Sequence, residues 1–311
     1  MPSHIKIVQG VKLWIAEARV PFLTASIVPV ILGSAIAWTT AASFNWGVFW
    51  LTMLGGVLLH AGTNIANDYF DHKSGNDEIN TEYVRPFTGG SRMIQQNLLT
   101  PRQVITGAFV CFIVGSIIGL YLAWLRGWPV LLLGAIGVFS GYFYTAPPFK
   151  LAHRGVGEIF VGMNFGILMT LGAYFVQTGS FSLSVAFAGI PVSLLIAAVL
   201  YINQFPDYNA DKAVGKNHLV VRLGRERAVK GYEILMMAVY ASIVIGVVGR
   251  ILPVLTVLAL LTFPMAMKAV GTARKHYADS AHLAPANAAT VLVHLLTGLL
   301  LSLGYLVKGL L

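Results

Sequence analysis

Long apolar stretches separated by short polar segments make up most of the chain. Nine of them have about the 20 residues that an α-helix needs to cross a bilayer, and they cover approximately residues 20–42, 46–67, 103–125, 128–146, 156–178, 181–203, 229–249, 251–270 and 286–308. Backbone polar groups inside a bilayer have to be paired within the segment, so each stretch is expected to be helical. The pattern predicts an all-α, polytopic membrane protein with nine transmembrane helices.

The first stretch starts close to the N-terminus and follows Lys6, Lys12 and Arg19. It is longer than the apolar core of a signal peptide, and many similar stretches come after it. We therefore expect it to be the first membrane-spanning helix rather than a cleaved signal.

Composition excludes an ordinary soluble domain. The 311 residues are 57% hydrophobic and 11% charged, with a mean hydropathy of +0.75, whereas soluble domains carry roughly 25% charged residues. The single cysteine, Cys111, excludes a disulfide within the chain and a cysteine-rich metal site. Because it lies inside an apolar stretch, we expect it only to pack.

The formal net charge of +9 reflects membrane topology rather than a nucleic-acid partner. If the N-terminus is cytosolic, all of the 21 Lys and Arg residues except Arg126, Arg250 and Lys308 fall on the cytosolic side. This bias follows the positive-inside rule and fits nine spans with a cytosolic N-terminus and an external C-terminus. The protein is expected to be a multi-pass protein of the cell or inner membrane, if the source is bacterial or archaeal. The sequence assigns no oligomeric state.

The twelve acidic residues also fall in or beside segments on the predicted cytosolic side. The positive-inside rule does not require this, because Asp and Glu contribute little to topology. The connections on the other side are short and nearly uncharged. We therefore expect the chemistry, and the cavity that holds it, at the cytosolic surface.

A weak internal repeat relates two parts of the chain. Asn64-x-x-x-Asp68 closes the second apolar stretch, and Asn203-x-x-x-Asp207 closes the sixth. The whole chain, 1–311, is predicted to be one domain with pseudo-repeat halves at about 20–146 and 156–270 plus a ninth helix. In such a bundle the two motifs would face each other across a cavity.

Helical spacing gathers the acidic residues of each motif. Asn64, Asp68 and Asp71 follow at i, i+4 and i+7, so a continuing helix places them on one face. The second motif has i, i+4 and i+8 spacing at Asn203, Asp207 and Asp211, and Pro206 requires that helix to kink or end.

Acidic groups at a membrane boundary persist where a cation joins them. Oxygen ligands without His or Cys suit Mg²⁺, which usually takes one or two carboxylates together with substrate phosphates. Basic residues that could bind phosphate oxygens flank both motifs: Lys73, Arg85, Arg92, Lys212, Lys216 and Arg222. The alternative, that such acids are only solvated or capping, is weakened by the matching pair of motifs. Asp77 and Glu78 are interpreted as loop charges.

At these residues the sequence resembles the UbiA-type membrane prenyltransferases, over nearly its whole length. The resemblance rests on both acidic motifs and on Arg19-Val-Pro21, Pro29-Val-Ile-Leu-Gly33, Thr88-Gly89-Gly90-Ser91, Tyr144-Thr145-Ala-Pro-Pro148, Arg154-Gly155-Val-Gly157-Glu158, Gly215-Lys216 and Val221-Arg222-Leu223-Gly224. Within the family the motifs look most like those of dihydroxynaphthoate polyprenyltransferases of menaquinone biosynthesis.

The resemblance implies Mg²⁺-dependent transfer of a polyprenyl group from its diphosphate to an aromatic ring. For a dihydroxynaphthoate acceptor, loss of the ring carboxylate accompanies the transfer. The metal-ligand positions of the family carry over to Asn64, Asp68, Asp71, Asp207 and Asp211. Some relatives have three residues between the last two acids of the first motif. Here two residues separate them, which leaves open whether Asp71 binds metal directly or through water.

Several other residues have two interpretations. Tyr144, with Tyr142, could stabilise a substrate carbocation through its ring face or belong to the interfacial aromatic belt. His60 and His294 are expected to be packed, hydrogen-bonded histidines, although His60 could line the cavity. An ion pair between Arg154 and Glu158 is favoured over recognition of the acceptor carboxylate by Arg154. Arg19 could reach the diphosphate or only mark topology.

Two alternative functions stay open from the sequence. A family member could use another acceptor, such as hydroxybenzoate, homogentisate, a tetrapyrrole or a glycerol phosphate. A cation-coupled transporter would also suit repeats and boundary carboxylates, but transporters usually carry ionisable residues at mid-bilayer, and the predicted spans have almost none.

Overall fold

The structure of the protein, a computed structural model, describes residues 3–40 and 44–311. Within these ranges the regular structure is entirely helical, which confirms the predicted fold class. The end of the first predicted span, near residue 42, lies outside the described residues. The elements in chain order are α1 Ser3–Glu17, η1 Val20–Leu23, α2 Thr24–Thr40, α3 Trp46–Lys73, α4 Asn76–Ile79, α5 Pro101–Arg126, α6 Pro129–Tyr142, η2 Leu151–His153, α7 Gly157–Gly162, η3 Met163–Leu168, α8 Met169–Thr178, α9 Leu183–Asn203, α10 Tyr208–Ala213, α11 Leu219–Leu223, α12 Arg225–Val248, η4 Val254–Thr262, α13 Phe263–His276 and α14 Ser280–Leu310.

Eight helical segments of the described chain are long and apolar enough to cross a membrane. The predicted stretch 128–146 corresponds to α6, which has only 14 residues. The predicted count of nine spanning helices is therefore not confirmed. The shortness of α6 has a local cause, because Pro129 starts the helix and the chain turns after Tyr142 toward Pro147 and Pro148.

Side-chain caps fix where several of the long helices begin. The side chain of Asn45 accepts a hydrogen bond from the Val48 amide at the start of α3. Thr100 and Gln103 form a reciprocal capping box at the start of α5, and Asp279 caps α14. These contacts satisfy backbone amides that the first turn of a helix leaves without partners.

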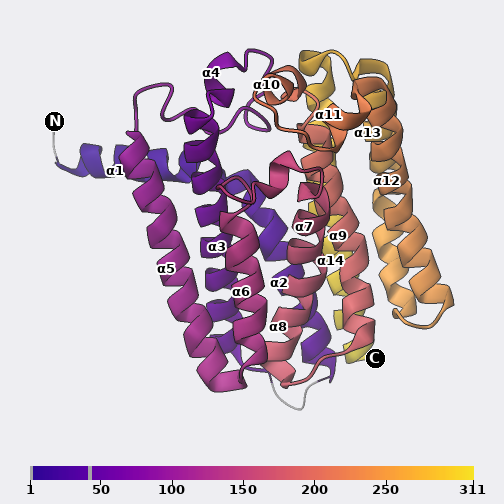
Figure 1. Ribbon diagram of the computed structural model, residues 1–311. Helices are drawn as coiled ribbons and strands as arrows, with labels where there is room; N and C mark the ends of the chain where they lie inside the picture. The colour runs from indigo at the N-terminus through magenta and orange to yellow at the C-terminus, as the bar shows by residue number, and fades with distance from the viewer. Residues whose placement is uncertain (1–2, 41–43) are drawn as a thin grey trace.

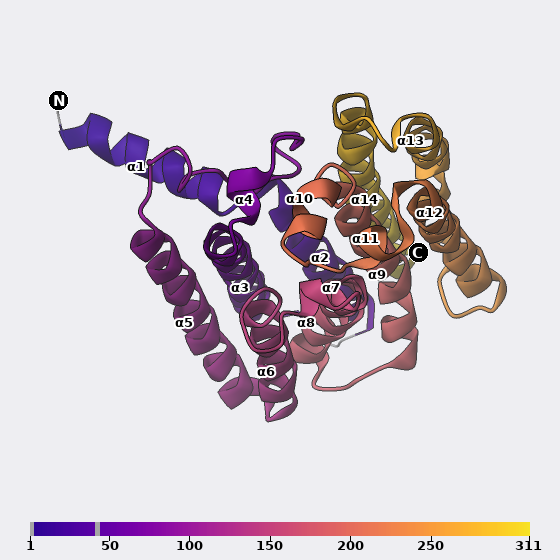
Figure 2. The same ribbon diagram turned by 45° about the horizontal axis from the view of Figure 1, so that its top comes forward.

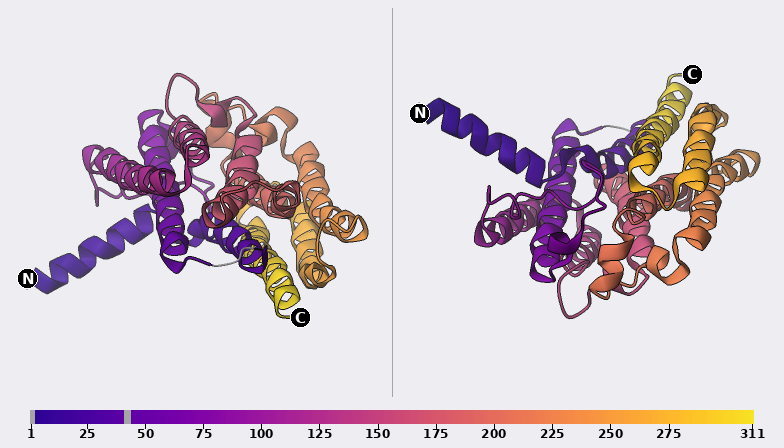
Figure 3. Two further views of the ribbon diagram at one scale, coloured as in Figure 1. Left: turned by 90° about the horizontal axis from the view of Figure 1, so that it is seen from below. Right: turned by 90° about the horizontal axis from the view of Figure 1, so that it is seen from above.

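The long helices form one bundle, and α1 lies near one end of it and points sideways, away from the bundle (Figure 1). Helices α3, α5 and α6 make up one side and α12 with α13 the opposite side, while α2, α9 and α14 run between them (Figure 3). The short helices α4, α10 and α11 gather at the end where α1 lies (Figure 2). Both acidic motifs lie at this end, because α3 is followed by α4 and α9 is followed by α10.

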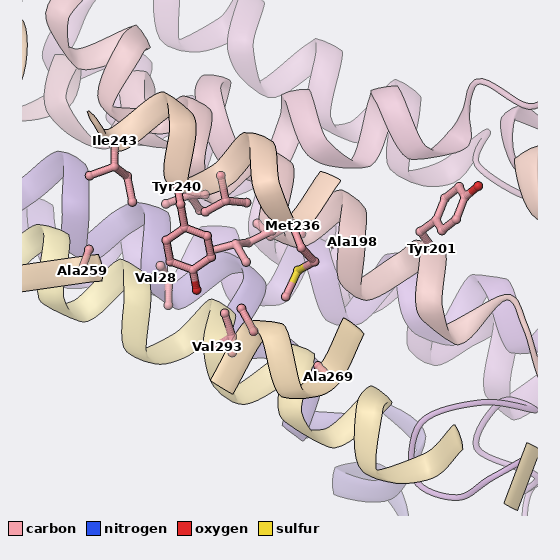
Figure 4. Close-up of a cluster of buried hydrophobic side chains, with 14 of the residues drawn as sticks. Val28, Ala198, Tyr201, Met236, Tyr240, Ile243, Ala259, Ala269 and Val293 are labelled. Atoms are coloured by element: carbon pink, nitrogen blue, oxygen red, sulfur yellow. The ribbon is translucent and has the colours of Figure 1, made fainter. Parts of the chain in front are cut away.

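The two sides of the bundle are filled differently. A large hydrophobic core joins α2, α9, α12, η4, α13 and α14, and Figure 4 shows part of it around Val28, Met236, Tyr240 and Val293. A smaller cluster packs α3 against α5. Space remains between these two clusters, and it forms the cavity described below.

Apolar side chains also cover the outside of the bundle. Trp124, Leu183, Val248 and Leu261 each expose more than two thirds of their surface. A water-soluble protein would pay heavily for such a surface, whereas lipid chains cover it without cost. The exterior thus matches the membrane-spanning lengths of the helices.

Glycines allow two pairs of helical segments, η3 with α9 and α2 with α8, to approach closely. A Cβ on Gly166, in the π-helical segment η3, would overlap the Ser193 backbone of α9, and one on Gly189 would lie 2.9 Å from the Cα atom of Ile167. A Cβ on Gly33 of α2 would lie 2.9 Å from the Cβ of Ala173 in α8. Small residues at such crossings are typical of membrane helix packing.

Candidate functional site

The two acidic motifs lie at the end of the bundle that α4 and α10 cover. Asp68 and Asp71 belong to the last turns of α3 and are 3% and 8% exposed. Helix α9 ends at Asn203, before Pro206. Asp207 then leads into α10, which contains the buried Asp211. The first motif thus lies on successive turns of one helix, as its spacing predicts, whereas the second is divided between the end of α9 and the start of α10.

Lys216 joins the two motifs. Its Nζ atom donates to both carboxylate oxygens of Asp71 at 3.0 Å and lies 3.4 Å from Oδ1 of Asp211. The side chains of Lys216, Asp71 and Asp211 are 11%, 11% and 5% exposed. A cation therefore already sits between a carboxylate of the first motif and a carboxylate of the second.

Two asparagines of α4 and its end strengthen this connection. Asn76 donates to Oδ1 of Asp211 at 2.9 Å, and Asn80 donates to Oδ1 of Asp207 at 2.7 Å. His218 contacts Oδ2 of Asp211 at 2.9 Å. The loop that follows the first motif thus supplies the hydrogen bonds that orient the acids of the second.

The Asp68 carboxylate has a different environment. Its Oδ2 accepts a hydrogen bond from the Ser91 amide at 2.8 Å, while its Oδ1 is buried and has no partner among the described residues. The Ser91 hydroxyl also donates a hydrogen bond to the carboxylate of Glu17, at the end of α1. Burial and, second, the Asp68 charge raise the pKa of Glu17 to about 8.

Burial and the charges of neighbouring groups also shift the pKa values of the acids and of the lysine at this end of the bundle. Burial, followed by repulsion from Asp211, raises the pKa of Asp207 to about 6. Burial, then the Asp71 and Asp68 charges, raise the pKa of Asp77 to about 9. Burial alone would also raise the pKa of Asp211, but Lys216 and His218 hold it below its ordinary value. Burial would lower the pKa of Lys216, yet Asp211 and Asp71 raise it well above the ordinary lysine value.

The acid-rich end has the donors that Mg²⁺ prefers. Within the described ranges no three His, Cys, Asp or Glu side chains form a ready-made metal cluster. Mg²⁺ does not need one, because it typically binds one or two carboxylates, waters and substrate phosphates. The unpartnered Oδ1 of Asp68 and the excess of buried carboxylates over lysines fit an added cation.

An apolar cavity of about 360 Å³ opens from this acidic end into the bundle. Its polar wall includes Asn64, Asp71, Asn203, Asp207, Asp211, Lys216 and Tyr144, and also Arg19. Its volume falls within the range typical of small-molecule sites. Burial, reinforced by the Glu158 charge, raises the pKa of Tyr144.

The other basic residues singled out in the sequence lie outside the cavity wall. Arg92 donates to the Asp77 carbonyl at 2.5 Å and stacks on the Tyr83 ring, and Arg222 donates to the carbonyl oxygens of Asn217 and Arg154. Lys73 and Lys212 lie over tyrosine rings, and Arg85 precedes Pro86 in an exposed loop. Their contact with a diphosphate stays a prediction.

Two interpretations from the sequence are wrong. Asp77 is not a solvated loop charge, because it is 3% exposed and lines the cavity. Arg154 and Glu158 form no ion pair in the described chain. Arg154 donates to the Phe149 and Pro148 carbonyls, and Glu158 accepts from Gln204 and from the Leu219 amide.

The two intramembrane histidines both line the cavity. His60 is hydrogen-bonded to Ser26 at 2.9 Å and lies against the Phe165 ring, as expected of a packed histidine. His294 is equally buried, but its Nε2 atom has no hydrogen-bond partner among the described residues. The expectation of a hydrogen-bonded His294 is therefore not met at this atom.

Sequence reasoning missed Glu17, Asn76, Asn80 and Ser91. These residues reach the acids across large sequence separations, up to 135 residues for Asn76 and Asp211. The Thr88–Ser91 segment belongs to the family resemblance, which assigns it no role. A run of small polar residues after the first motif is the one local signal that could have indicated its role.

Similar proteins of known name include enzymes that act on naphthoate or naphthoquinone rings. The chain is 28% identical over 296 residues to a 2-carboxy-1,4-naphthoquinone phytyltransferase of Synechocystis, covering 94% of this chain and 93% of the relative. It is 32% identical to a 1,4-dihydroxy-2-naphthoate octaprenyltransferase of Mycobacterium tuberculosis, covering 84% and 86%.

Solved structures share the fold. A UbiA homolog from Aeropyrum pernix superimposes with a TM-score of 0.62 at 15% identity, covering 91% of this chain and 97% of that one. A UbiA homolog from Archaeoglobus fulgidus, solved with GPP and Mg²⁺, gives a TM-score of 0.57 at 14% identity and covers 93% and 99%.

The match to a known family covers most of the chain. Residues 26–291 match the UbiA prenyltransferase family. Together with the eight apolar helices, this makes the protein an integral multi-pass membrane enzyme of the prenyltransferase class. The chain belongs to the UbiA prenyltransferase family.

Proposed function

We propose that the protein transfers a polyprenyl group from its diphosphate to an aromatic acceptor in a Mg²⁺-dependent reaction, with 1,4-dihydroxy-2-naphthoate as the acceptor. The observation that carries this proposal is the position of Lys216. One buried ammonium group contacts acids of both motifs at the mouth of an apolar cavity. A diphosphate with its metal requires both acidic and basic groups at the cavity mouth, and a prenyl tail requires the apolar walls deeper in the cavity.

The residues proposed to hold Mg²⁺ are those of the two motifs: Asn64, Asp68, Asp71, Asn203, Asp207 and Asp211. Bound Mg²⁺ would neutralise charge on the departing diphosphate. Lys216 and Arg19, both in the cavity wall, are proposed to bind diphosphate oxygens through charge-assisted hydrogen bonds.

The chemistry itself needs a dry site. As the allylic C–O bond breaks, its electron pair leaves with the diphosphate, and a carbon of the electron-rich ring supplies the pair for the new C–C bond. Bond formation leaves a cationic, non-aromatic ring. With a carboxylated ring, the bond between the ring and the carboxylate then breaks, its electron pair returns to the ring and restores aromaticity, and CO₂ leaves where a proton would leave otherwise. Apolar walls keep water from capturing the carbocation, and the ring face of Tyr144 would stabilise it.

The acceptor assignment is supported by the two relatives named above, whose names specify naphthoate and naphthoquinone substrates. Topology is proposed as well. The distribution of Lys and Arg supports a cytosolic N-terminus, and α1 lies at the same end of the bundle as the acidic motifs (Figure 1). The active site would then open toward the cytosol.

The test is an assay of purified protein in lipid nanodiscs with geranylgeranyl diphosphate and a panel of aromatic acceptors. Pyrophosphate release and prenylated product are measured with Mg²⁺ and with excess chelator. Product is expected only with Mg²⁺, and Asp68→Asn or Asp207→Asn should lower kcat/KM by at least about 100-fold, as for groups that stabilise transition-state charge. The control is Glu226→Gln, which changes an exposed acid of α12.

The outcomes separate the levels of the proposal. Product with hydroxybenzoate or homogentisate but not with dihydroxynaphthoate would replace the acceptor and keep the reaction. Full activity in Asp207→Asn would remove the second motif from the site. Failure to transfer a prenyl group to any acceptor would contradict the proposed reaction.

A further inference from the structure

The cavity, from its polar mouth to its apolar depth, runs along most of the length of helix α3. Along α3 its wall reaches from Thr52 to Asp71, which is about 28 Å at 1.5 Å per residue and close to the thickness of the hydrocarbon core. On α6, the wall is formed by Val130, Leu133, Gly134, Gly137 and further residues of the same helical face. Residues of α5 and α8 form the remaining walls of this part of the cavity.

Three glycines in this wall have no packing reason to be glycine. Gly119 of α5 and Gly134 and Gly137 of α6 lie inside helices, where glycine is less favourable than alanine. None has a positive φ angle, and a Cβ built on any of them meets no atom within 4 Å. By contrast, Gly166 and Gly33 are held against backbone or side-chain atoms of neighbouring helices.

The three positions lie at neighbouring depths. Gly119 comes eight residues before Gly127, where α5 turns into α6, and Gly134 comes seven residues after it. Gly137 lies three residues nearer to the acidic end, about 4.5 Å along the helix. Gly172 of α8 faces the same level, because its Cβ would lie 3.5 Å from Leu133. Missing side chains on three helices therefore widen one section of the cavity.

A second observation indicates that a ligand completes this cavity. His294 is 2% exposed and lines it, yet its Nε2 atom has no partner among the described residues. Buried polar atoms are normally paired, so an unpaired one in a cavity wall points to a group that arrives with a ligand. The wide section and this nitrogen belong to the same space.

We propose that Gly134 and Gly137, together with Gly119, set the length of the prenyl chain that the enzyme accepts. The inference rests on the proposed function, because it requires the diphosphate at the acidic end. The tail then runs down the face of α6 past Gly137 and Gly134 in turn. A side chain at either glycine would stop the tail at that depth without disturbing the packing of the helices.

Two substitutions on one helix test the proposal. Gly137→Leu and Gly134→Leu each add a leucine side chain to open space, and Ala135→Leu adds a similar volume on the exposed face of α6. Each variant is assayed with geranyl, farnesyl, geranylgeranyl and longer all-trans prenyl diphosphates at saturating acceptor. Thermal stabilisation by each diphosphate with Mg²⁺ is measured as well, since it requires no acceptor.

Both glycine variants should keep kcat/KM for geranyl diphosphate near the wild-type value, which also shows that they fold. The ratio of kcat/KM for long to short chains should fall roughly tenfold or more, as a filled apolar pocket discriminates between chain lengths. The longest prenyl chain that is still transferred efficiently should be shorter for Gly137→Leu than for Gly134→Leu. The chain-length preference of Ala135→Leu should match that of the wild type.

Equal losses with every chain length, or no change in the ratio, would overturn the proposal, and so would the same cut-off in both variants. If the wild type transfers no prenyl group to any acceptor, the proposed function fails. The chain-length dependence of thermal stabilisation then still decides the role of the glycines.

Discussion

Lys216 connects parts of the chain that lie 145 residues apart, since its ammonium group contacts Asp71 and Asp211. The ammonium neutralises part of a cluster of acids, and burial, followed by mutual repulsion, raises the pKa of Asp207 and Asp77 in this cluster. Breaking a buried pair by removal of one partner leaves unpaired charge and is costly. Lys216 is therefore expected to stabilise the fold as well as to bind diphosphate.

Replacement of this lysine gives a prediction that separates the two roles. Lys216→Met keeps the length of the side chain and removes its charge, which should lower the stability by about 3 kcal/mol. Mg²⁺ should raise the melting temperature of the variant more than that of the wild type, because a bound cation replaces the missing charge. Thermal unfolding in nanodiscs with and without Mg²⁺ measures both effects.

The matched control is Lys212→Met, because Lys212 is exposed and lies over the Tyr208 ring rather than against the acids. It should change stability by less than about 1 kcal/mol. Equal melting temperatures for Lys216→Met and wild type, with equal responses to Mg²⁺, would show that the acids need no cation.

Part of the site could be predicted from single residues and their spacing, and part could not. Intervals of three and four residues bring Asn64, Asp68 and Asp71 together on one face of any helix. The arrangement of the first motif can therefore be predicted from the sequence. Contacts of Asn80 with Asp207 and of Ser91 with Glu17 depend on how distant segments pack. No local pattern encodes those pairings.

At the scale of elements, the close crossing of η3 and α9 holds the centre of the bundle. Gly166 lies in the π-helical segment η3, and a Cβ there would overlap backbone and side-chain atoms of Ser193. Backbone atoms cannot move aside as the end of a flexible side chain can. The two segments would have to separate, and Asn164 and Phe165 of η3, which line the cavity, would move with them.

A single methyl group tests this crossing. Gly166→Ala should destabilise the protein by about 1–3 kcal/mol through overpacking, seen as a lower melting temperature. Gly271→Ala makes the same change in α13, where nothing lies within 4 Å of the new Cβ, and should be neutral or slightly stabilising. A stable Gly166→Ala variant would mean that the crossing is looser than its geometry indicates.

The existence of most long helices can be predicted from the sequence, because lipid requires long apolar helices with internally paired backbones. The positions of the helix ends are harder to predict. The stretch 128–146 is apolar enough to suggest a full span, yet α6 stops at Tyr142, before the Pro147-Pro148 pair. The division of the last-but-one span into η4 and α13 at Phe263 also has no signal in hydropathy. The relation between the two pseudo-repeat halves stays a prediction.

The whole molecule has an expected orientation in the membrane. A cytosolic N-terminus places Thr81, in the loop after α4, on the cytosolic side and Ser180, between α8 and α9, on the external side. Both positions are exposed. In a Cys111→Ser background, Ser180→Cys should react with a membrane-impermeant maleimide in intact cells, whereas Thr81→Cys should react only after the membrane is permeabilised. The reverse labelling pattern would invert the orientation and place the acidic end outside.

The cavity is charged at its mouth and apolar along its depth, and this polarity has a consequence for turnover. Under the proposed reaction, cleavage of one bond separates a fully water-soluble product from a fully lipid-soluble one. Pyrophosphate dissolves in the aqueous phase, and the prenylated ring no longer carries the group that tethered it to the mouth. Each product is diluted into a phase that excludes the other, so their recombination becomes rare. The bilayer then acts as a sink that draws the reaction forward, and release of the product requires no further source of energy.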